Sequence, residues 1–120
     1  MPLNNEDTVF QYFKLIENKD IDGILDLFDY NAVVSEPFSK SQGLRGKASI
    51  EPFFKVAAMA NAGLNRKIEI QKRVNGRTDP DKLVALVTFE KGNKTKGRFT
   101  FEFTDSDGAR RIKSLRIEFL

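Results

Sequence analysis

The predicted fold is decided by two stretches of the sequence: residues 9–38, VFQYFKLIENKDIDGILDLFDYNAVVSEPF, and residues 43–54, GLRGKASIEPFF. At the start of the first segment, apolar side chains recur at the three- and four-residue spacing of a helix. Those side chains are Val9, Phe10, Phe13 and Ile16. Because Tyr12 lies beside this apolar stripe, the sequence predicts an amphipathic helix with a tyrosine at the edge of its buried face.

The remainder of the first segment predicts a second short helix and a strand. Asp20 is a natural N-cap, because its carboxylate can accept a hydrogen bond from a free backbone N–H group. The apolar face of this helix consists of Ile21, Ile24, Leu25 and Phe28. We expect residues 30–31 to turn the chain and residues 32–36 to form a strand that Pro37 ends. A third helix is predicted from about residue 47 to residue 62.

The second half of the chain has the period of strands. Large apolar residues occupy every second position of residues 96–104 and 111–119. Further strands are predicted over residues 64–74 and 83–90. A sheet of long strands has to cover its apolar face, and the helices are available to cover it. We therefore predict an α+β fold, with a curved antiparallel sheet wrapped around three N-terminal helices, in a single domain over residues 1–120.

Composition excludes several classes of function. The sequence contains no cysteine, so disulfides, thiolate metal sites and cysteine nucleophiles are impossible. It contains no histidine, which rules out a Ser-His-Asp triad and a histidine-ligated zinc. No apolar run approaches the roughly 20 residues that a membrane span needs, and the polar first residues are not typical of a secretory signal. We expect a cytoplasmic protein that makes no contact with a membrane.

Charge is unevenly distributed along the chain. Residues 1–36 are mainly acidic, and the remainder is basic, with pairs such as Arg66–Lys67 and Arg110–Arg111. A basic surface can bind the phosphates of a nucleic acid. The phenylalanines, however, alternate away from these charges as core residues do, and do not form a stacking platform for bases. We therefore expect the basic pairs on solvated strand faces and no nucleic-acid partner.

Residues 9–54 resemble, in order, spacing and wording, the first half of an NTF2-like domain, and are most similar to ketosteroid isomerase and the SnoaL-like proteins. The resemblance implies a cone-shaped α+β fold. Ketosteroid isomerases carry a first-helix tyrosine that donates a hydrogen bond to the carbonyl oxygen of the substrate, and Tyr12 falls at that position. Their aspartate base ends the first strand before a proline, where this chain has Glu36 and Pro37. Their late-strand protonated aspartate corresponds to Phe101 here.

The resemblance implies that Glu36 removes a proton alpha to a carbonyl while Tyr12 stabilises the oxyanion. It implies a small, mostly apolar carbonyl compound as substrate, and no metal or organic cofactor. The ligand-binding residues are expected to be Phe28, Phe38, Phe53, Phe54, Met59, Phe101, Leu115 and Ile117. The structural alternatives are an ion pair of Glu36 with Arg45 or Lys47, and a core Tyr12 whose hydroxyl binds a backbone group.

Other functional classes and the oligomeric state stay open at this point. The chain could be a non-catalytic small-molecule-binding or dimerisation module, or an interaction domain whose basic sheet binds an acidic partner. NTF2-like proteins commonly pair through the outer face of the sheet, which implies a homodimer. The residues predicted on this face are Thr88, Thr100, Thr104 and Ser114, together with Arg98, Glu102, Arg116 and Glu118. Small hydroxyl residues allow close approach, and opposite charges can pair across a two-fold axis.

Overall fold

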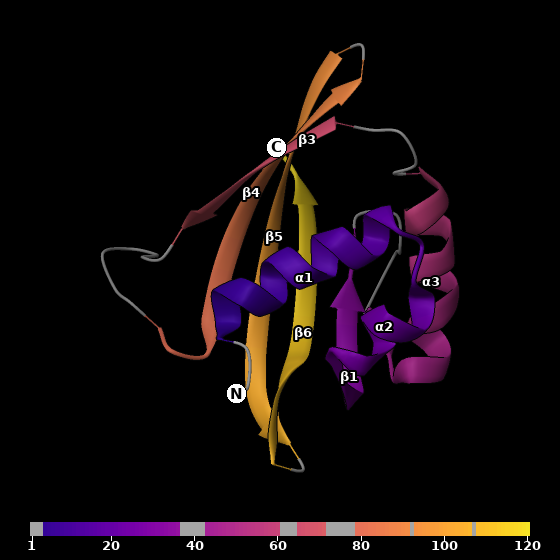
Figure 1. Ribbon diagram of the computed structural model, residues 1–120, viewed down its shortest axis with the longest axis vertical. Helices are drawn as coiled ribbons and strands as arrows, with labels where there is room; N and C mark the ends of the chain where they lie inside the picture. The colour runs from indigo at the N-terminus through magenta and orange to yellow at the C-terminus, as the bar shows by residue number, and fades with distance from the viewer. Residues whose placement is uncertain (1–3, 37–42, 61–64, 72–78, 92, 107) are drawn as a thin grey trace.

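The computed structural model describes residues 4–36, 43–60, 65–71, 79–91, 93–106 and 108–120 (Figure 1). The helices in these ranges are α1 (Asn5–Glu17), α2 (Ile21–Asp26) and α3 (Lys47–Ala60). The strands are β1 (Phe28–Ser35), β2 (Leu44–Arg45), β3 (Asn65–Gln71), β4 (Lys82–Lys91), β5 (Asn93–Ser106) and β6 (Ala109–Phe119). The predicted α+β class is confirmed. Because α3 follows β1 and β2 in the chain, the helices are not all N-terminal to the sheet.

The first two helices begin at side-chain caps. The Oδ1 atom of Asn4 accepts a hydrogen bond of 2.7 Å from the N–H of Asp7, at the start of α1. The Oδ1 atom of Asp20 accepts a bond of 3.0 Å from the N–H of Gly23, so Asp20 is the N-cap of α2, as predicted. Each cap satisfies a backbone donor that has no partner within the helix. The caps therefore fix where both helices start.

The strands form one curved sheet in the order β2-β1-β6-β5-β4-β3. The pairs formed by β3, β4, β5 and β6 are antiparallel and follow one another along the chain. A register shift between Glu102 and Phe103 interrupts the long β5–β6 pair. Such a bulge bends a strand and increases its local twist. The predicted strands of the second half are thus present, although residues 72–74 and residue 64 lie outside the described ranges.

Strand β1 differs from the prediction in two ways. It pairs with β6 in parallel, so the prediction of an entirely antiparallel sheet was wrong. Residues 30–31 lie within β1 rather than in a turn before it. The β1–β6 register shifts between Phe28 and Val33, where the chain on β1 bulges out of the ladder. The polar, exposed residues at this bulge carry a turn-like signal although the strand continues through it.

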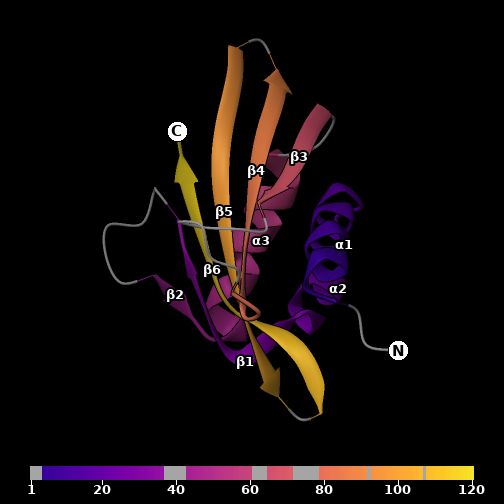
Figure 2. The ribbon, with the colours of Figure 1, turned by 90° about the vertical axis from the view of Figure 1, so that its left-hand side faces the viewer.

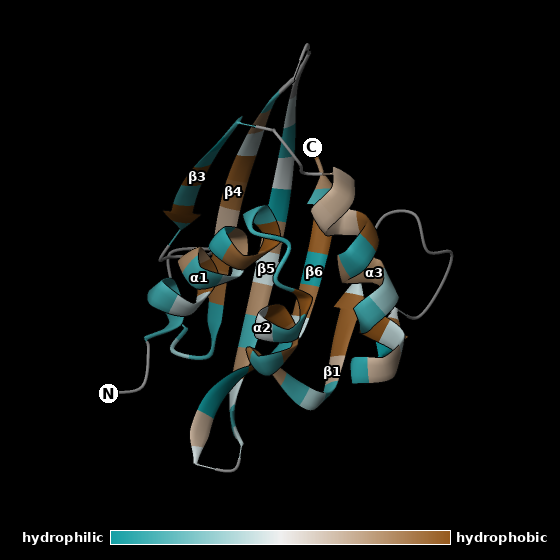
Figure 3. Cartoon of the chain, turned by 45° about the vertical axis from the view of Figure 1, so that its right-hand side comes forward, coloured by the Kyte–Doolittle hydropathy of each residue, from teal (hydrophilic) through white to brown (hydrophobic). Residues whose placement is uncertain are grey.

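The helices pack against the sheet and enclose an aromatic core. In Figure 1, α1 crosses in front of the long strands and α3 lies beside β1. Figure 2, turned by 90°, places α1 and α2 on one side of the twisted sheet. Figure 3 shows hydrophobic residues, in brown, along β1 and β4. The largest fully buried side chains are Phe28, Phe54 and Phe101.

In the described part of the chain, no helix combines the length and apolar character needed to cross a membrane.

Candidate functional site

A cavity of about 490 Å³ lies between the helices and the sheet. Its lining residues come from α1, α3 and strands β4 to β6, and from the residue that follows β1. They are Tyr12, Glu36, Phe53, Val56, Ala57, Ala60, Phe89, Phe99, Ile117 and Phe119. All of these except Tyr12 and Glu36 have wholly apolar side chains. The volume falls in the range of about 300–1,000 Å³ that is usual for small-molecule sites.

Exposure distinguishes the deep end of this cavity from its mouth. Tyr12 is only 2% exposed and therefore lies at the deep end. Val56 on α3 is 67% exposed, and Phe119 near the end of β6 is 48% exposed. These two apolar residues therefore border the mouth. A ligand entering here would pass apolar side chains before it reached the tyrosine.

Strand register brings Glu36 to the same level as the aromatic wall of the cavity. Phe99 on β5 is paired with Ile117 on β6, and both residues line the cavity. Ser35, the last residue of β1, is paired with Arg116, the neighbour of Ile117. Because Glu36 follows Ser35 directly, it continues this row across the sheet. Its half-buried side chain lines the cavity with Tyr12, so the two predicted catalytic residues border one space.

Aromatic neighbours hold the ring of Tyr12 in place. It makes edge-to-face contacts with Phe13, Phe54 and Phe101, at centroid distances of 5.0, 5.9 and 5.5 Å. A further contact of the same kind, at 6.3 Å, is made with Phe28. Such contacts favour one ring orientation. Burial raises the pKa of the Tyr12 hydroxyl well above its usual range, and the positive charge of Arg66 lowers it by less. Tyr12 is therefore a neutral hydrogen-bond donor across the physiological pH range.

The eight predicted ligand-binding residues fall into different environments. Phe53 and Ile117 line the cavity. The core residues, which do not line it, are Phe28, Phe54, Phe101 and Leu115. Met59 is exposed on α3 and also does not line it. Phe38 lies outside the described residues. The buried phenylalanines therefore shape the cavity indirectly, by holding Tyr12 and α3.

Several lining residues were not predicted from the sequence. They are Val56, Ala57, Ala60, Phe89, Phe99 and Phe119. Phe99 and Phe119 belong to the alternating apolar faces of their strands, and that alternation places them on the side of the sheet that the helices cover. The residues on α3 carry no comparable signal, because small apolar side chains on a helix look alike whether they face a core, a cavity or a mouth.

Metal binding has no structural support in the part of the chain that is described. Among those residues there is no cluster of three or more acidic side chains that could hold an ion. The described residues that line the cavity contribute one carboxylate, that of Glu36, and one phenol, that of Tyr12. This donor set suits hydrogen bonding and proton transfer better than ligation of a metal ion.

The architecture is that of an NTF2-like protein, and solved structures match it over nearly the whole chain. No protein-family model matches the chain, and no curated protein matches its sequence. An NTF2-like protein of unknown function from Pseudomonas putida is 12% identical, with a TM-score of 0.69, over 94% of this chain and 82% of its own. The NTF2-like fold implied by the resemblance is therefore confirmed.

Two further structures show how varied the proteins with this fold are. SalBIII, described as an epoxide hydrolase/cyclase-like enzyme in pyran ring formation in the polyether salinomycin, is 22% identical, with a TM-score of 0.69. The match covers 96% of this chain and 89% of SalBIII. A putative calcium/calmodulin-dependent protein kinase type II association domain from Thiobacillus denitrificans is 10% identical, with a TM-score of 0.68. That match covers 100% of this chain and 98% of the association domain.

Proposed function

We propose that the cavity binds a small, mostly apolar carbonyl compound and that Glu36 and Tyr12 catalyse proton transfer on it, as in a ketosteroid isomerase. The observation that carries this proposal is that Glu36 and Tyr12 both line one cavity whose other described lining residues are apolar. An apolar lining with a few convergent polar groups is typical of small-molecule sites. The similarity of the fold to SalBIII, an enzyme, agrees with a catalytic use of the cavity.

In the proposed reaction, the Glu36 carboxylate removes a proton from the carbon next to the carbonyl. The electrons of that C–H bond form the enolate double bond, and the carbonyl oxygen becomes an oxyanion. The Tyr12 hydroxyl donates a hydrogen bond to this oxygen. In a substrate with a β,γ double bond this enolate is a dienolate, and protonated Glu36 returns the proton to its γ carbon. The double bond then lies between the α and β carbons, the oxyanion becomes a carbonyl again, and the carboxylate is restored. Both residues end the cycle in their starting states, so no cofactor is needed.

Burial of Tyr12 suits it to the role of oxyanion donor. The raised pKa of its hydroxyl keeps the proton on oxygen, where it can be shared with a ligand. A hydrogen bond to an anion is stronger in a water-poor cavity than in solvent, because the surrounding dielectric response is weaker. The ring contacts hold the donor before the substrate arrives, which avoids a reorganisation cost during the reaction.

The second candidate is a non-catalytic ligand-binding module with the same cavity. The observation that favours it is Phe101, which occupies the late-strand position of the second oxyanion donor and packs its ring against Tyr12. Loss of one such donor typically reduces a rate by about 10²–10³-fold. If the protein is catalytic, we therefore expect its proton transfer to be slower than that of an enzyme with both oxyanion donors.

The test uses a β,γ-unsaturated cyclic ketone, whose conversion to the conjugated isomer is followed by ultraviolet absorbance. Exchange of its alpha protons in D₂O, followed by NMR, separates proton removal from complete isomerisation. The wild-type protein should catalyse exchange, and Tyr12→Phe should slow it by about 10²–10³-fold. Binding of the ketone without exchange above the buffer rate would favour the non-catalytic module. Absence of binding across a series of ring sizes would contradict both candidates.

The outer face of the sheet is proposed as the surface of a homodimer in the cytoplasm. Its hydroxyl residues, Thr88, Thr100, Thr104 and Ser114, are all partly buried already within one chain. Arg98 and Glu118 form an ion pair of 4.0 Å across β5 and β6. This pairing leaves Arg116 and Glu102 as the charges proposed to meet across the two-fold axis.

A further inference from the structure

Arg66 on β3 is a buried cation at the edge of the sheet. Its side chain is 7% exposed, whereas that of the neighbouring Lys67 is 79% exposed. Removing a guanidinium from water is costly unless hydrogen bonds and an opposite charge compensate for it. An apolar residue could fill such a position at lower cost, so the contacts of Arg66 need an explanation.

The contacts of Arg66 hold its charge against the C-terminal half of α1. Its Nη2 atom donates a hydrogen bond of 3.1 Å to the backbone carbonyl of Phe13. Its guanidinium carbon lies 5.6 Å from the centre of the Phe13 ring, within the range of a cation–π interaction. The same Nη2 atom is 3.5 Å from Oε2 of Glu17. Phe13 thus fixes the guanidinium on two sides, through its backbone and its ring.

The opposite charge on Glu17 only partly offsets the positive charge of Arg66. The Glu17 side chain is 70% exposed, so water and salt screen its carboxylate. The guanidinium, in contrast, is surrounded mainly by protein, where its field is screened less. The net effect on the buried side of Arg66 is a positive potential.

Tyr12 lies close to this positive potential, because Phe13 contacts both Arg66 and Tyr12. Phe13 follows Tyr12 in the chain, and their rings pack edge to face with centroids 5.0 Å apart. The charge of Arg66 lowers the pKa of Tyr12, opposing the larger effect of burial. Among the described lining residues, Glu36, on the β1 side, is the other ionisable group that borders the cavity with Tyr12. Tyr12 is therefore influenced by two opposite charges: the positive charge of Arg66 and the negative charge of the Glu36 carboxylate.

We propose that Arg66 is a positioning residue that tunes Tyr12 for an anionic ligand oxygen: its fixed charge stabilises the negative charge that the Tyr12 hydroxyl shares when it donates to that oxygen. The inference deepens the proposed function and rests on it. In this chain, Arg66 offsets part of what is lost with Phe101 at the second donor position. The preferred ligands then carry an enolate or phenolate oxygen rather than a neutral carbonyl alone.

The test measures the acidity of Tyr12 without any ligand or turnover. The chain has two tyrosines and no tryptophan, so Tyr30→Phe leaves Tyr12 as the single tyrosine. Tyr30 is exposed at the β1 bulge, so its replacement leaves the cavity intact. Replacing the remaining tyrosine with a ring-fluorinated analogue lowers the pH at which its hydroxyl ionises. The ¹⁹F NMR shift then reports the titration of position 12, and circular dichroism at each pH confirms that the chain is folded.

Four variants in this background each have a stated expected effect on the titration. Arg66→Met should make the acid dissociation constant of the position-12 phenol about three- to tenfold smaller, because a nearby positive charge is removed. Glu17→Gln should shift it the other way and by less, because Glu17 is exposed. Lys67→Met removes the same charge from a neighbouring exposed site and should leave it unchanged. Arg66→Lys keeps a charge there and should retain part of the wild-type value, which separates charge from packing if Arg66→Met loosens the fold.

An unchanged titration in a folded Arg66→Met variant, a shift in Arg66→Lys as large as that in Arg66→Met, or a shift of equal size in Lys67→Met would overturn the inference. Failure of the proposed function gives a different pattern. In that case, the titrations would still respond to Arg66, but 4-nitrophenol would show no binding to the wild-type cavity. If both hold, 4-nitrophenolate should bind the wild-type protein about three- to tenfold more tightly than it binds Arg66→Met.

Discussion

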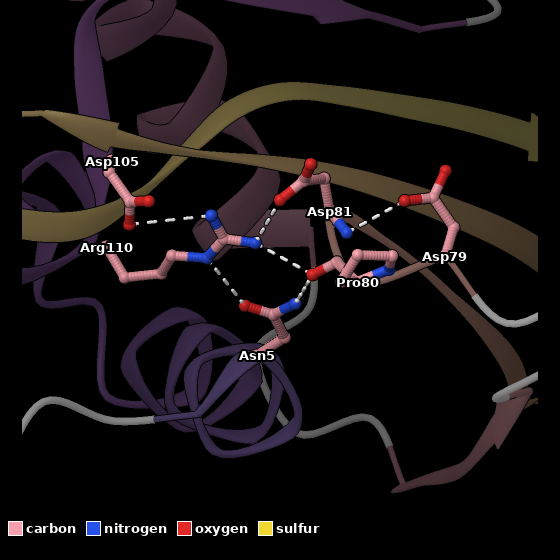
Figure 4. A network of polar contacts seen from close by, with 6 residues as sticks. All are labelled: Asn5, Asp79, Pro80, Asp81, Asp105 and Arg110. Atoms are coloured by element: carbon pink, nitrogen blue, oxygen red, sulfur yellow. Dashed lines mark hydrogen bonds and ion pairs between the residues drawn. The ribbon is translucent and has the colours of Figure 1, made fainter.

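Arg110 and Asn5 are joined by a hydrogen bond of 3.2 Å although 105 positions separate them in the chain (Figure 4). Arg110 donates from Nε to the Oδ1 atom of Asn5, and from Nη2 to the Pro80 carbonyl at 2.7 Å. It also pairs with the carboxylates of Asp81 and Asp105. The Nδ2 atom of Asn5 in turn donates 2.7 Å to the same Pro80 carbonyl. This network ties the first turn of α1 to the segment before β4 and to the β5–β6 hairpin.

Loss of the Arg110 network should destabilise the fold. Arg110→Met keeps the length of the side chain but removes every donor, and leaves the Asn5, Pro80 and Asp81 acceptors without this partner. Hydrogen bonds to charged groups each contribute about 1.5–3 kcal/mol, and the exposure of Asp81 and Asp105 reduces this. We expect a loss of about 1–3 kcal/mol in the free energy of unfolding, measured in urea. Lys113→Met, an exposed charge loss on the same strand, is the matched control and should change stability by less than about 0.5 kcal/mol.

Glu36→Gln should abolish turnover and leave the fold intact. Glutamine has nearly the same shape as glutamate but cannot accept the alpha proton. General-base catalysis typically contributes about 10²–10⁴-fold to a rate, and a loss of that size is expected in the D₂O exchange assay. Affinity for the ketone should change little. Exchange at the wild-type rate in this variant would assign the base to another residue or favour the non-catalytic module.

Blocking the cavity should prevent ligand binding without unfolding the protein. Ala57 lines the cavity from α3, and Ala57→Phe would place a ring in the space that a ligand occupies. We expect the affinity for an apolar naphthalene probe, followed by fluorescence, to fall at least about tenfold, together with a stability change of about 1–3 kcal/mol if the ring strains the site. Ala48→Phe introduces the same ring at an exposed position of α3 and serves as the control. Equal probe binding by both variants would mean that the probe binds elsewhere.

Acid should weaken the protein partly through Asp29. Hydrogen bonds from the Ser106 side chain and from the N–H groups of Asn31 and Tyr30 lower the pKa of the Asp29 carboxyl. A carboxyl whose pKa is lower in the folded state than in the unfolded state stabilises the fold above its unfolded pKa, about 3.9. That contribution is lost as the pH falls from this value through the lower folded pKa. The free energy of unfolding of Asp29→Asn should therefore fall less steeply below about pH 4 than that of the wild type. Parallel acid limbs for the two proteins would show that Asp29 is not a source of the pH dependence.

The features of the fold that depend on neighbouring residues in the chain could be predicted from the sequence. Helical periodicity located α1, the Asp20 cap located the start of α2, and alternation located the long strands. Phe28, expected on the apolar face of the second helix, is instead the first residue of β1. The parallel pairing of β1 with β6 was missed because it joins segments about 80 residues apart, and nothing in either strand specifies a partner direction. The basic pair at 66–67 was expected to be solvated. This was correct for Lys67 but wrong for Arg66, whose burial depends on the position of α1.

The candidate site could be predicted only in part, for the same reason. The positions of Tyr12 and Glu36 followed from the resemblance, and both residues line the cavity. Which aromatic residues would face the cavity did not follow, because several large side chains compete for the same apolar interior. Phe54 and Phe101 fill the core, while Phe89 and Phe99 line the cavity. That division depends on how α3 sits on the sheet, which is a property of the whole fold.

A homodimer through the outer face of the sheet should depend on Arg116 and Glu102. Arg116 is exposed on β6, and Glu102 is partly buried on β5, on the face that carries Thr100 and Ser114. Arg116→Glu places two like charges against each other if this patch meets its own copy across a two-fold axis, which typically costs several kcal/mol in a specific interface. Light scattering at micromolar concentration should show a dimer for the wild type and a monomer for Arg116→Glu. The double variant Arg116→Glu with Glu102→Arg restores opposite charges and should recover the dimer. Because the face is strongly charged, the wild-type dimer should also weaken as salt is raised. A wild-type monomer at every salt concentration, or a dimer that Arg116→Glu leaves intact, would contradict this interface.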